Sequence, residues 1–294
     1  YQFVLYKWQI VLYHIDMKRF DYVTDGEYSK RGYLLNDFKV FNIKDKRSEA
    51  FEFHYHEFNK IILFKSGDVK YNIEGKEYQL KPNDILLVKR GDIHKPIISE
   101  NEFYDRIIIW IDDSYLNAIR LLECFEIAEK TGFKLINCAD NQLFSLAEKL
   151  CRSSEKDFAY KEYNEALLTQ LLILITRSIM HNDIDRKKYK SDEQIDRLLK
   201  YINSNLDKKL CIDSLAEMFF ISRYHLMHKF KEQTGTTIYS YIQSKRLLNA
   251  AKSIKCGMSI KEACYRNGFN DYSVFLKAFK KEFGITPTKY KERE

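Results

Sequence analysis

The chain has 294 residues, with 49 Lys and Arg against 42 Asp and Glu, which gives a formal net charge of +7 at pH 7. This length exceeds the usual size of a single hydrophobic core, so we expect more than one domain. The six cysteines are scattered without a Cys-x-x-Cys pair, which argues against a disulfide framework or a cysteine zinc site. No apolar run reaches the roughly 18 residues of a membrane span.

Residues 1–16 are apolar and aromatic, and they lack the small-residue cleavage site of a secretory signal. The chain does not begin with Met, whereas Met17-Lys18-Arg19 resembles a natural start. We therefore expect residues 1–16 to be an extra or non-native segment. The alternative is a core strand.

Short strands separated by turn signals are predicted over residues 36–112. Val69–Ile73 alternates between apolar and polar residues and ends in Glu74-Gly75-Lys76, a typical hairpin turn. Lys81–Asp84 is a second turn, and Ile107–Ile111 reads as a buried strand. Many short strands at this spacing predict a barrel or a sandwich.

Three histidines fall within these predicted strands. Alternation places His54 and His56 on one face of a strand, and His94 follows a Gly-Asp turn. The pattern resembles a cupin barrel, whose metal-binding members carry His-x-His on one strand and a third His after such a turn. Those members have a Glu four or five residues after the second His of the His-x-His pair. At these positions after His56, this chain has Lys60 and Ile61. Because a lysine repels a metal cation, we expect no metal and no cofactor. The open alternatives are a metal-free pocket and ordinary core histidines.

A long helix is predicted from Tyr163 to His181. Leu167, Leu171 and Leu174 follow the four-and-three spacing of a heptad, and further leucines and isoleucines widen the apolar face. A face this wide exceeds what one barrel needs to cover, so we expect a dimer contact. The alternative is that the helix packs only on its own barrel.

After a polar, charged linker at residues 182–191, one helix-turn-helix pattern occurs twice. From Ser222 and Asp271 to Tyr241 and Tyr290, all matches are offset by 49 residues. The alanines that precede these matches, Ala216 and Ala263, are offset by 47 residues, so we expect the second turn to be two residues longer. Such a repeat in constant register predicts two copies of one structural unit.

Each copy has the features of a helix that presents one face to DNA. Leu226 and Phe230 lie four residues apart and so share a helical face, and Phe275 and Phe279 repeat the pair. Gly268 suits a left-handed helix stop, and the residues that open the second helices are good N-caps. A helix held by one face exposes the other, which is the geometry of a recognition helix in the major groove.

The two units are predicted at residues 212–231 and 260–281. From Ser191 onward there are 19 Lys and Arg against 12 Asp and Glu, whereas the preceding residues have 30 of each sign. The whole formal excess of positive charge therefore lies in the duplicated region, as expected for contacts with phosphates. The alternative is a pair of solvated amphipathic helices without DNA.

The segment from Ala263 through Gly268-Phe269 to Thr286-Pro287 and Tyr290 closely resembles the signature of AraC/XylS-type transcription regulators. The resemblance implies two helix-turn-helix units joined by a long central helix, which Tyr241 to about Lys255 matches. It also implies that the barrel binds a small effector and that the helix before the linker forms a dimer.

The resemblance implies residues for each role. The DNA-binding candidates are Arg223, Tyr224, His228, Lys231, Asn270, Tyr272, Ser273, Lys277, Lys280 and Thr286. The effector-binding candidates are His54, His56, Phe58, His94, Tyr104 and Arg106. His228 stands where relatives often carry Arg, which leaves the base preference open. Arg106 pairs either with an acidic ligand group or within a structural ion pair.

The expected fold class is a multidomain α+β protein with a cupin-like barrel, a helical dimerisation segment and an all-α domain carrying two helix-turn-helix motifs. The expected domains are a barrel at 17–115, a helical segment at 116–181, the linker at 182–191 and a DNA-binding domain at 192–294. No catalytic Ser/His/Asp or Cys/His signature and no phosphate-binding glycine loop occurs in the sequence.

We therefore expect a cytoplasmic, sequence-specific transcription regulator, an effector-responsive activator and not an enzyme, which associates with the nucleoid when bound. Its expected partners are double-stranded DNA, a small-molecule effector, a second copy of the chain and, for an activator, RNA polymerase, with no membrane. One alternative is a metal-dependent cupin oxygenase or isomerase with a DNA-binding tail. Another is a ligand-independent DNA-binding dimer.

Overall fold

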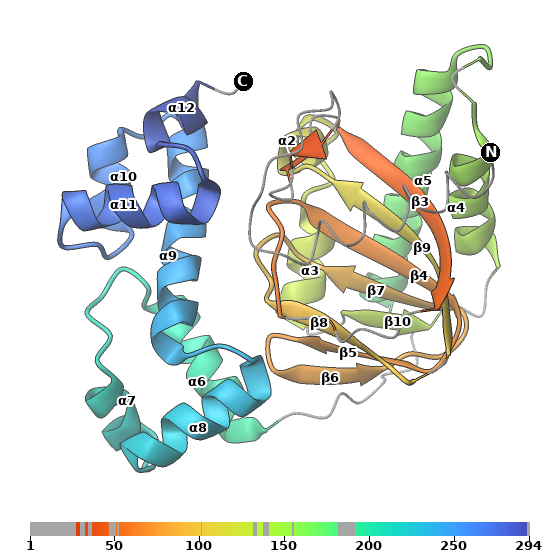
Figure 1. Cartoon of the computed structure of the whole chain (residues 1–294). Helices are drawn as coiled ribbons and strands as arrows, with labels where there is room; N and C mark the ends of the chain where they lie inside the picture. Colours follow the sequence, from red (N-terminus) through yellow and green to blue (C-terminus); the bar gives the residue numbers. More distant parts are fainter. Residues whose placement is uncertain are drawn as a thin grey trace. The chain divides into compact units, whose positions relative to one another are not determined.

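The computed structural model describes residues 28–29, 33–34, 37–46, 51, 53–100, 102–131, 134–137, 141–154, 156–181 and 192–292. The segments 1–16 and 182–191, expected to be an extra segment and a linker, lie outside these residues. The chain divides mainly into a β-rich unit within residues 23–190 and a helical unit within residues 191–294 (Figure 1).

An antiparallel five-stranded sheet forms the centre of the β-rich unit. In spatial order its strands are β10 (Leu135–Asn137), β7 (Asp84–Val88), β4 (Asn59–Ser66), β9 (Phe103–Ile111) and β3 (Phe38–Lys46). The second sheet has the order β6 (Lys76–Gln79), β5 (Val69–Ile73) and β8 (His94–Ile98). Two short strands, β1 (Tyr28–Ser29) and β2 (Tyr33–Leu34), pair with each other. The predicted series of short strands is confirmed.

The side chains of β4 alternate between two hydrophobic cores. Ile61 and Leu63 pack with the helices that cover the five-stranded sheet, whereas Ile62 and Phe64 pack with residues of β5 and β6. Successive side chains of a strand point to opposite faces. Lys60 therefore points to the same side as Ile62, into the interior between the two sheets.

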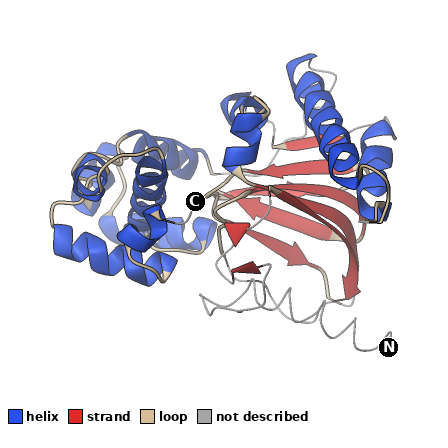
Figure 2. Cartoon of the chain, turned by 90° about the horizontal axis from the view of Figure 1, so that it is seen from above, coloured by secondary structure: helices blue, strands red, loops and turns tan. Residues whose placement is uncertain are grey.

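Helices cover one face of the five-stranded sheet (Figure 2). They are α2 (Asp113–Ala118), α3 (Glu123–Thr131), α4 (Gln142–Arg152) and α5 (Tyr160–His181). In α5 the side chains of Leu168, Leu171, Leu172 and Ile175 are fully buried in the core shared with the sheet. Because one chain already buries most of the apolar stripe of α5, the breadth of the stripe does not by itself require a partner.

Residues 116–181 are not wholly helical. The three residues of β10 lie among them and pair antiparallel with β7 at the edge of the sheet. A strand this short has no readable periodicity, so its pairing depends on the neighbouring strand more than on its own sequence. No helix in the described part of the chain is both long and apolar enough to cross a membrane.

The helical unit contains the two predicted helix-turn-helix pairs. Its helices are α6 (Glu193–Ser204), α7 (Ile212–Met218), α8 (Arg223–Thr234), α9 (Ile238–Lys255), α10 (Ile260–Arg266), α11 (Tyr272–Phe283) and α12 (Pro287–Lys291). The first pair is α7 and α8, the second is α10 and α11, and α9 joins them (Figure 1). Both pairs end in a left-handed glycine at the C-cap of the second helix, Gly235 and Gly284.

The turns inside the two pairs differ by one residue. Each contains one residue with positive φ, Phe220 at 54° and Gly268 at 78°. The next helix has its N-cap at Ser222 in the first copy and at Asp271 in the second, and both side chains accept from a backbone N–H. Two residues separate Gly268 from its N-cap and one separates Phe220 from its N-cap, so Asn270 is the additional residue.

Our expectation of a two-residue difference is wrong, because Ala216 and Ala263 do not hold equivalent positions. The N–H of Ile221 closes the first turn on the carbonyl oxygen of Ala216 at 3.0 Å. In the second turn the N–H of Phe269 reaches the carbonyl oxygen of Cys264 at 3.2 Å. Cys264 is therefore the equivalent of Ala216. Matching Ala216 with Ala263, because both are alanines, shifted the sequence alignment of the two helices by one residue.

Candidate DNA-binding face and barrel interior

The predicted first recognition helix, α8, buries one face and exposes the other. Leu226 and Phe230 are fully buried, whereas Tyr224, His228 and Lys231 are exposed. These three exposed residues are separated by four and three positions, so they lie on one side of the helix. The rings of Tyr224 and His228 are nearly parallel, with centroids 6.3 Å apart.

The second helix of the second pair, α11, repeats this arrangement. Phe275 and Phe279 are fully buried, and Ser273, Lys277 and Lys280 are exposed at the same spacing. Each lies 49 residues after its counterpart in α8. We call these two three-residue sets the reading faces of α8 and α11.

Two further DNA-binding candidates have partners within the protein. Arg223 donates from Nη1 to both carboxylate oxygens of Asp213, at 2.9 and 3.2 Å, and both side chains are exposed. Tyr272 is half-buried, and its ring stacks on Phe275 with centroids 6.3 Å apart. Asn270, the additional turn residue, is exposed.

Thr286 is the N-cap of α12, and its hydroxyl accepts from the N–H of Lys289 at 3.4 Å. Thr237 holds the equivalent place at the start of α9, where its hydroxyl accepts from the N–H of Ser240 at 3.1 Å. Both threonines are exposed and come two residues after a left-handed glycine. An exposed helix N-terminus offers N–H groups to a phosphate, and the sequence prediction included only the second of these two sites.

In the β-rich unit, three histidines form a cluster, and two of them contact the side chain of Lys60. The ring of His54 lies 4.4 Å from that of His94 and 5.0 Å from that of His56, measured between centroids. Lys60 Nζ lies 2.9 Å from His56 Nε2 and 3.4 Å from His94 Nε2. His56, Lys60 and His94 are all buried. An isolated β-bridge brings His54 beside His94, because the two residues exchange backbone hydrogen bonds of 3.0 and 2.8 Å. The prediction that His54 and His56 lie on a strand is wrong, since β4 begins only at Asn59.

Both buried imidazoles have a lowered pKa. Burial lowers the pKa of His56 well below its usual value, and the positive charge of Lys60 lowers it further. Burial also lowers the pKa of His94, with additional contributions from His54 and Lys60. At neutral pH these two rings are therefore uncharged, and each has one N–H donor and one acceptor nitrogen.

Aromatic side chains line the cluster. The ring of Phe58 stacks between His56 and Trp110, at centroid distances of 4.7 and 4.6 Å. Tyr71 stacks on His94 at 6.1 Å. Histidine, lysine and aromatic groups together give this end of the barrel interior both polar and apolar surface, as small-molecule sites have.

The structure does not place Tyr104 and Arg106 with the histidines. On β9, Trp110 is paired with Lys60 of β4, whereas Arg106 is paired with Phe64. Four residues along a strand correspond to about 13 Å. Arg106 is fully buried, donates to the carbonyl oxygen of Tyr104 at 2.6 Å and lies 3.9 Å above its ring. The six effector candidates therefore form two separate groups.

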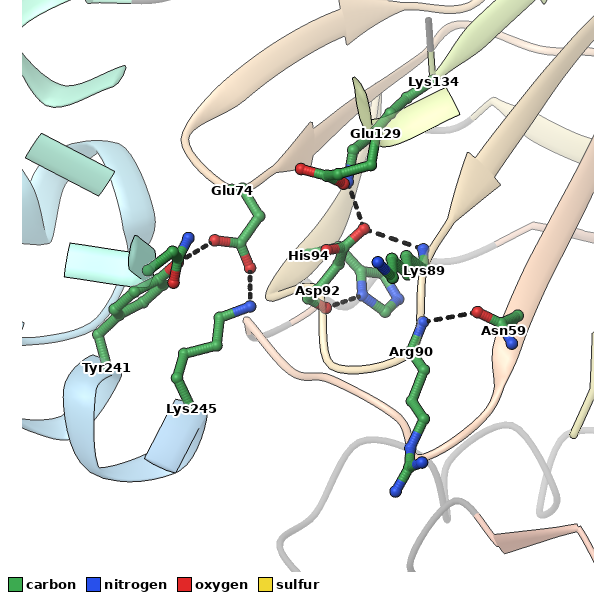
Figure 3. Close-up of polar contacts among 11 residues, drawn as sticks. Asn59, Glu74, Lys89, Arg90, Asp92, His94, Glu129, Lys134, Tyr241 and Lys245 are labelled. Carbon is green, nitrogen blue, oxygen red and sulfur yellow. Dashed lines mark hydrogen bonds and ion pairs between the residues drawn. The ribbon is translucent and has the colours of Figure 1, made fainter. Parts of the chain in front are cut away.

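A buried ion pair supports the loop that leads to His94 at the start of β8 (Figure 3). The Asp92 carboxylate accepts from Lys134 Nζ at 2.5 Å and from the N–H of Lys89 at 2.9 Å. Glu129 of α3 lies 2.8 Å from the same Lys134 amine. The carbonyl oxygen of Asp92 lies 2.9 Å from His94 Nδ1. Asp92 thus fixes the orientation of the His94 ring and links it to α3.

Two family profiles match the chain, one for each unit. The profile described as an AraC-like ligand binding domain matches residues 43–172, and a helix-turn-helix domain profile matches residues 215–293. The chain belongs to the AraC/XylS family of transcription regulators. It is a DNA-binding regulator with a ligand-binding domain, in agreement with the resemblance found in its sequence.

Curated relatives of this AraC/XylS-family regulator cover most of its length. The HTH-type transcriptional activator RhaS of Mannheimia succiniciproducens is 29% identical over 244 residues, which are 81% of this chain and 88% of the relative. The activator RhaR of the same organism is 24% identical over 268 residues, 90% of this chain and 96% of the relative. A solved structure of ToxT from Vibrio cholerae covers 87% of this chain and 98% of its own, at 16% identity and a TM-score of 0.38.

In this AraC/XylS-family regulator, three residues outside the predicted sets lie beside the predicted ones. Val274 is 53% exposed beside the reading face of α11, where an apolar side chain can contact a thymine methyl group. Its position outside the buried pair of phenylalanines was a signal that could have identified it. Lys60 of β4 and Trp110 of β9 are paired with each other, and both side chains lie beside His56 in the barrel cluster.

Proposed function

We propose that α8 and α11 enter two major grooves and read bases through their reading faces. The observation that supports this most strongly is the repetition of three exposed positions at a constant offset of 49 residues on two capped helices. Tyr224, His228, Ser273 and Lys277 provide the base contacts, because they lie in the first half of each helix. Lys231, Lys280 and Thr286 contact phosphates, and Arg223, Asn270 and Tyr272 border the two faces.

The test is the affinity of the full chain for the promoter DNA that flanks its own gene, at two salt concentrations, with random DNA as the control. We expect the promoter to bind more tightly and both affinities to fall as salt displaces phosphate contacts. Equal affinity for both DNAs, with and without candidate effectors, would contradict specific recognition.

For the β-rich unit we propose that a small effector binds at the end of the interior that contains His54, His56, His94 and Phe58. Two neutral imidazoles, an amine and stacked aromatic rings suit a compact molecule with hydroxyl or carbonyl groups. A thermal-shift screen of sugars, organic acids and aromatic compounds tests this proposal. We expect a hit whose stabilisation disappears in His94→Ala and persists in Arg106→Lys, because Arg106 lies about 13 Å away. If the compound no longer stabilises Arg106→Lys but still stabilises His94→Ala, the effector binds at the end of the interior that contains Arg106.

We further propose that two copies of the chain associate through an open groove of about 560 Å³ beside α5. Its apolar floor includes Ile173 and Leu174, with Glu162 and Glu165 near one end and Arg177 near the other. Fifteen residues of helix separate Glu162 from Arg177 by about 22 Å. An antiparallel pair of α5 helices therefore places acidic groups opposite the arginine of the second copy.

Sedimentation of the full chain tests this contact. We expect a dimer that Arg177→Glu weakens and that the exchanged variant, with Glu162→Arg and Glu165→Arg added, restores. A monomeric wild type at micromolar concentration would exclude the dimer. Because the restoring variant reverses every charge, a general loss of folding cannot imitate its result.

By analogy with the RhaS and RhaR activators, we propose that the bound dimer increases transcription by RNA polymerase in the bacterial cytoplasm. A reporter fused to the bound promoter measures this directly. Expression should fall when the gene is deleted, whereas a rise would make the protein a repressor. The regulator requires no enzymatic activity for this role.

A further inference from the structure

The three histidines of the barrel interior form a group that could hold a metal ion. Their nearest ligand atoms all lie within 4.8 Å of one another, and among the described residues no other His, Cys, Asp or Glu joins the group. Three imidazoles suit Zn²⁺, Co²⁺ or Ni²⁺. Some cupin barrels, which the sequence resembles, bind a metal through such histidines, so the fit of these residues to a metal is decided by their geometry.

The distances around Lys60 do not fit a metal. Its Nζ lies 2.9 Å from His56 Nε2 and 3.4 Å from His94 Nε2, which are hydrogen-bond lengths. A bound zinc ion would lie about 2.0–2.1 Å from each nitrogen, which brings two ligand nitrogens to about 3.3 Å from each other in a tetrahedron. The histidine nitrogens lie within 4.8 Å of one another, and the Lys60 ammonium group takes the place beside two of them that a metal ion would need.

The tautomers of the two rings point to the same conclusion. His94 Nδ1 lies 2.9 Å from the carbonyl oxygen of Asp92, which can only accept, so Nδ1 carries the hydrogen. A neutral imidazole has a single N–H, and the Nε2 lone pair of His94 consequently faces the Lys60 amine. His56 also presents Nε2 to this amine. Two imidazole lone pairs converge on one ammonium group, as they would on a metal ion.

We infer that the ammonium group of Lys60 occupies the cation position of the three-histidine cluster, so that this chain excludes divalent metals from its barrel. Lys60 determines which kind of ligand the barrel recognises. Recognition at this end then relies on hydrogen bonds from lysine and histidine, and a metal-dependent oxygenase or isomerase reaction has no centre there. Lys60 has this role whether or not the barrel senses an effector.

The test measures Zn²⁺ and Co²⁺ binding to the metal-free full chain by competition with a chromophoric chelator and by the Co²⁺ absorption spectrum. Wild type and Lys60→Arg should bind neither ion in the barrel. Lys60→Ala should bind one equivalent at least about 1,000-fold more tightly than wild type, the factor that repulsion between charges about 4 Å apart implies at an effective dielectric constant near 20. Lys60→Glu should bind more tightly still, because it supplies a carboxylate ligand.

Two controls separate this result from other causes. Adding His94→Ala to Lys60→Ala should abolish metal binding in the barrel. Because this double variant keeps His225 and His228 of α8, any metal binding that remains comes from the surface. If Lys60→Ala does not fold, thermal stabilisation of Lys60→Glu by Zn²⁺ gives the same information. Stoichiometric binding by wild type as tight as that of Lys60→Ala, or absence of binding in both variants, would overturn the inference.

Discussion

The turns of the two helix-turn-helix copies both contain one residue with positive φ, but that residue is a phenylalanine in the first copy and a glycine in the second. Phe220 and Gly268 both have positive φ, yet the Phe220 side chain is 97% exposed, whereas Gly268 lies against the other half of the unit. A Cβ at Gly268 would overlap the carbonyl oxygen of Leu206 and lie 2.9 Å from the Arg246 guanidinium. Positive φ by itself tolerates a side chain, as Phe220 shows, whereas the packing around Gly268 leaves no room for one.

Arg246 explains why the second turn is so crowded. From α9 it donates through Nε to the carbonyl oxygen of Leu206 at 2.7 Å and through Nη2 to that of Lys208 at 2.6 Å. The guanidinium therefore holds the loop after α6 against the turn of the second copy. The two copies differ because the positive-φ residue of the second turn packs against Leu206 and Arg246, whereas that of the first turn is exposed.

The largest effect should result from Gly268→Ala. The added methyl group combines a strained φ with a backbone overlap, so we expect a loss of about 2–4 kcal/mol in the free energy of unfolding. Urea denaturation of the full chain measures it, with Phe220→Ala as the matched control at the equivalent position. Equal effects of the two substitutions would show that packing does not distinguish the turns.

The reading faces should differ in which bases they select. We expect Lys277→Ala to weaken specific DNA binding by about 1–3 kcal/mol and to relax the preference at one base position. His228→Ala should change the preference in the other half of the site. Selection from randomised DNA measures both, with the exposed Lys252→Ala of α9 as a charge-matched control. An unchanged preference in Lys277→Ala would reduce that residue to a phosphate contact.

Phe220→Gly should stabilise the protein by up to about 1 kcal/mol, because glycine adopts positive φ without steric cost. The same urea denaturation experiment measures this change. A loss of stability would mean that the exposed phenyl ring makes a stabilising contact that its 97% exposure does not indicate.

Asp213→Asn should have the smallest effect on stability, below about 1 kcal/mol, because its ion pair with Arg223 is exposed. It should nevertheless strengthen non-specific DNA binding and steepen its salt dependence by about one phosphate contact, since Arg223 becomes available. Glu217→Gln removes the same charge from the same helix. If both variants behave alike, the ion pair has no role of its own.

The sequence predicted the helical unit well because its signals are local. The caps Ser222 and Asp271 and the buried pairs Leu226/Phe230 and Phe275/Phe279 are read within a few residues, and the structure confirms them. The alignment of Ala216 with Ala263 failed because a turn of variable length separates the local patterns. Only the backbone hydrogen bonds that close the two turns show which residues correspond.

The barrel interior was less predictable, since its contacts depend on strand register. The His-x-His pattern grouped His54 and His56 correctly, although neither lies in a named strand, but it could not show that Arg106 lies at the other end from His94. The side of the sheet that Lys60 faces also depends on pairing with β9. Sequence identified the residue types of the site, and long-range pairing decided which of them meet.

The threonine-capped helices that come after the two copies have a consequence for how the protein can evolve. In the second copy this helix has 5 residues, whereas in the first it extends to 18 and joins the copies. One residue added to such a helix rotates the next helix-turn-helix unit by about 100° and advances it by about 1.5 Å. One base pair added to DNA rotates the neighbouring site by about 35° and advances it by about 3.4 Å. One residue inserted in α9 is therefore not compensated by one base pair inserted in the DNA, so under the proposed mode of binding the length of α9 constrains the operator spacing.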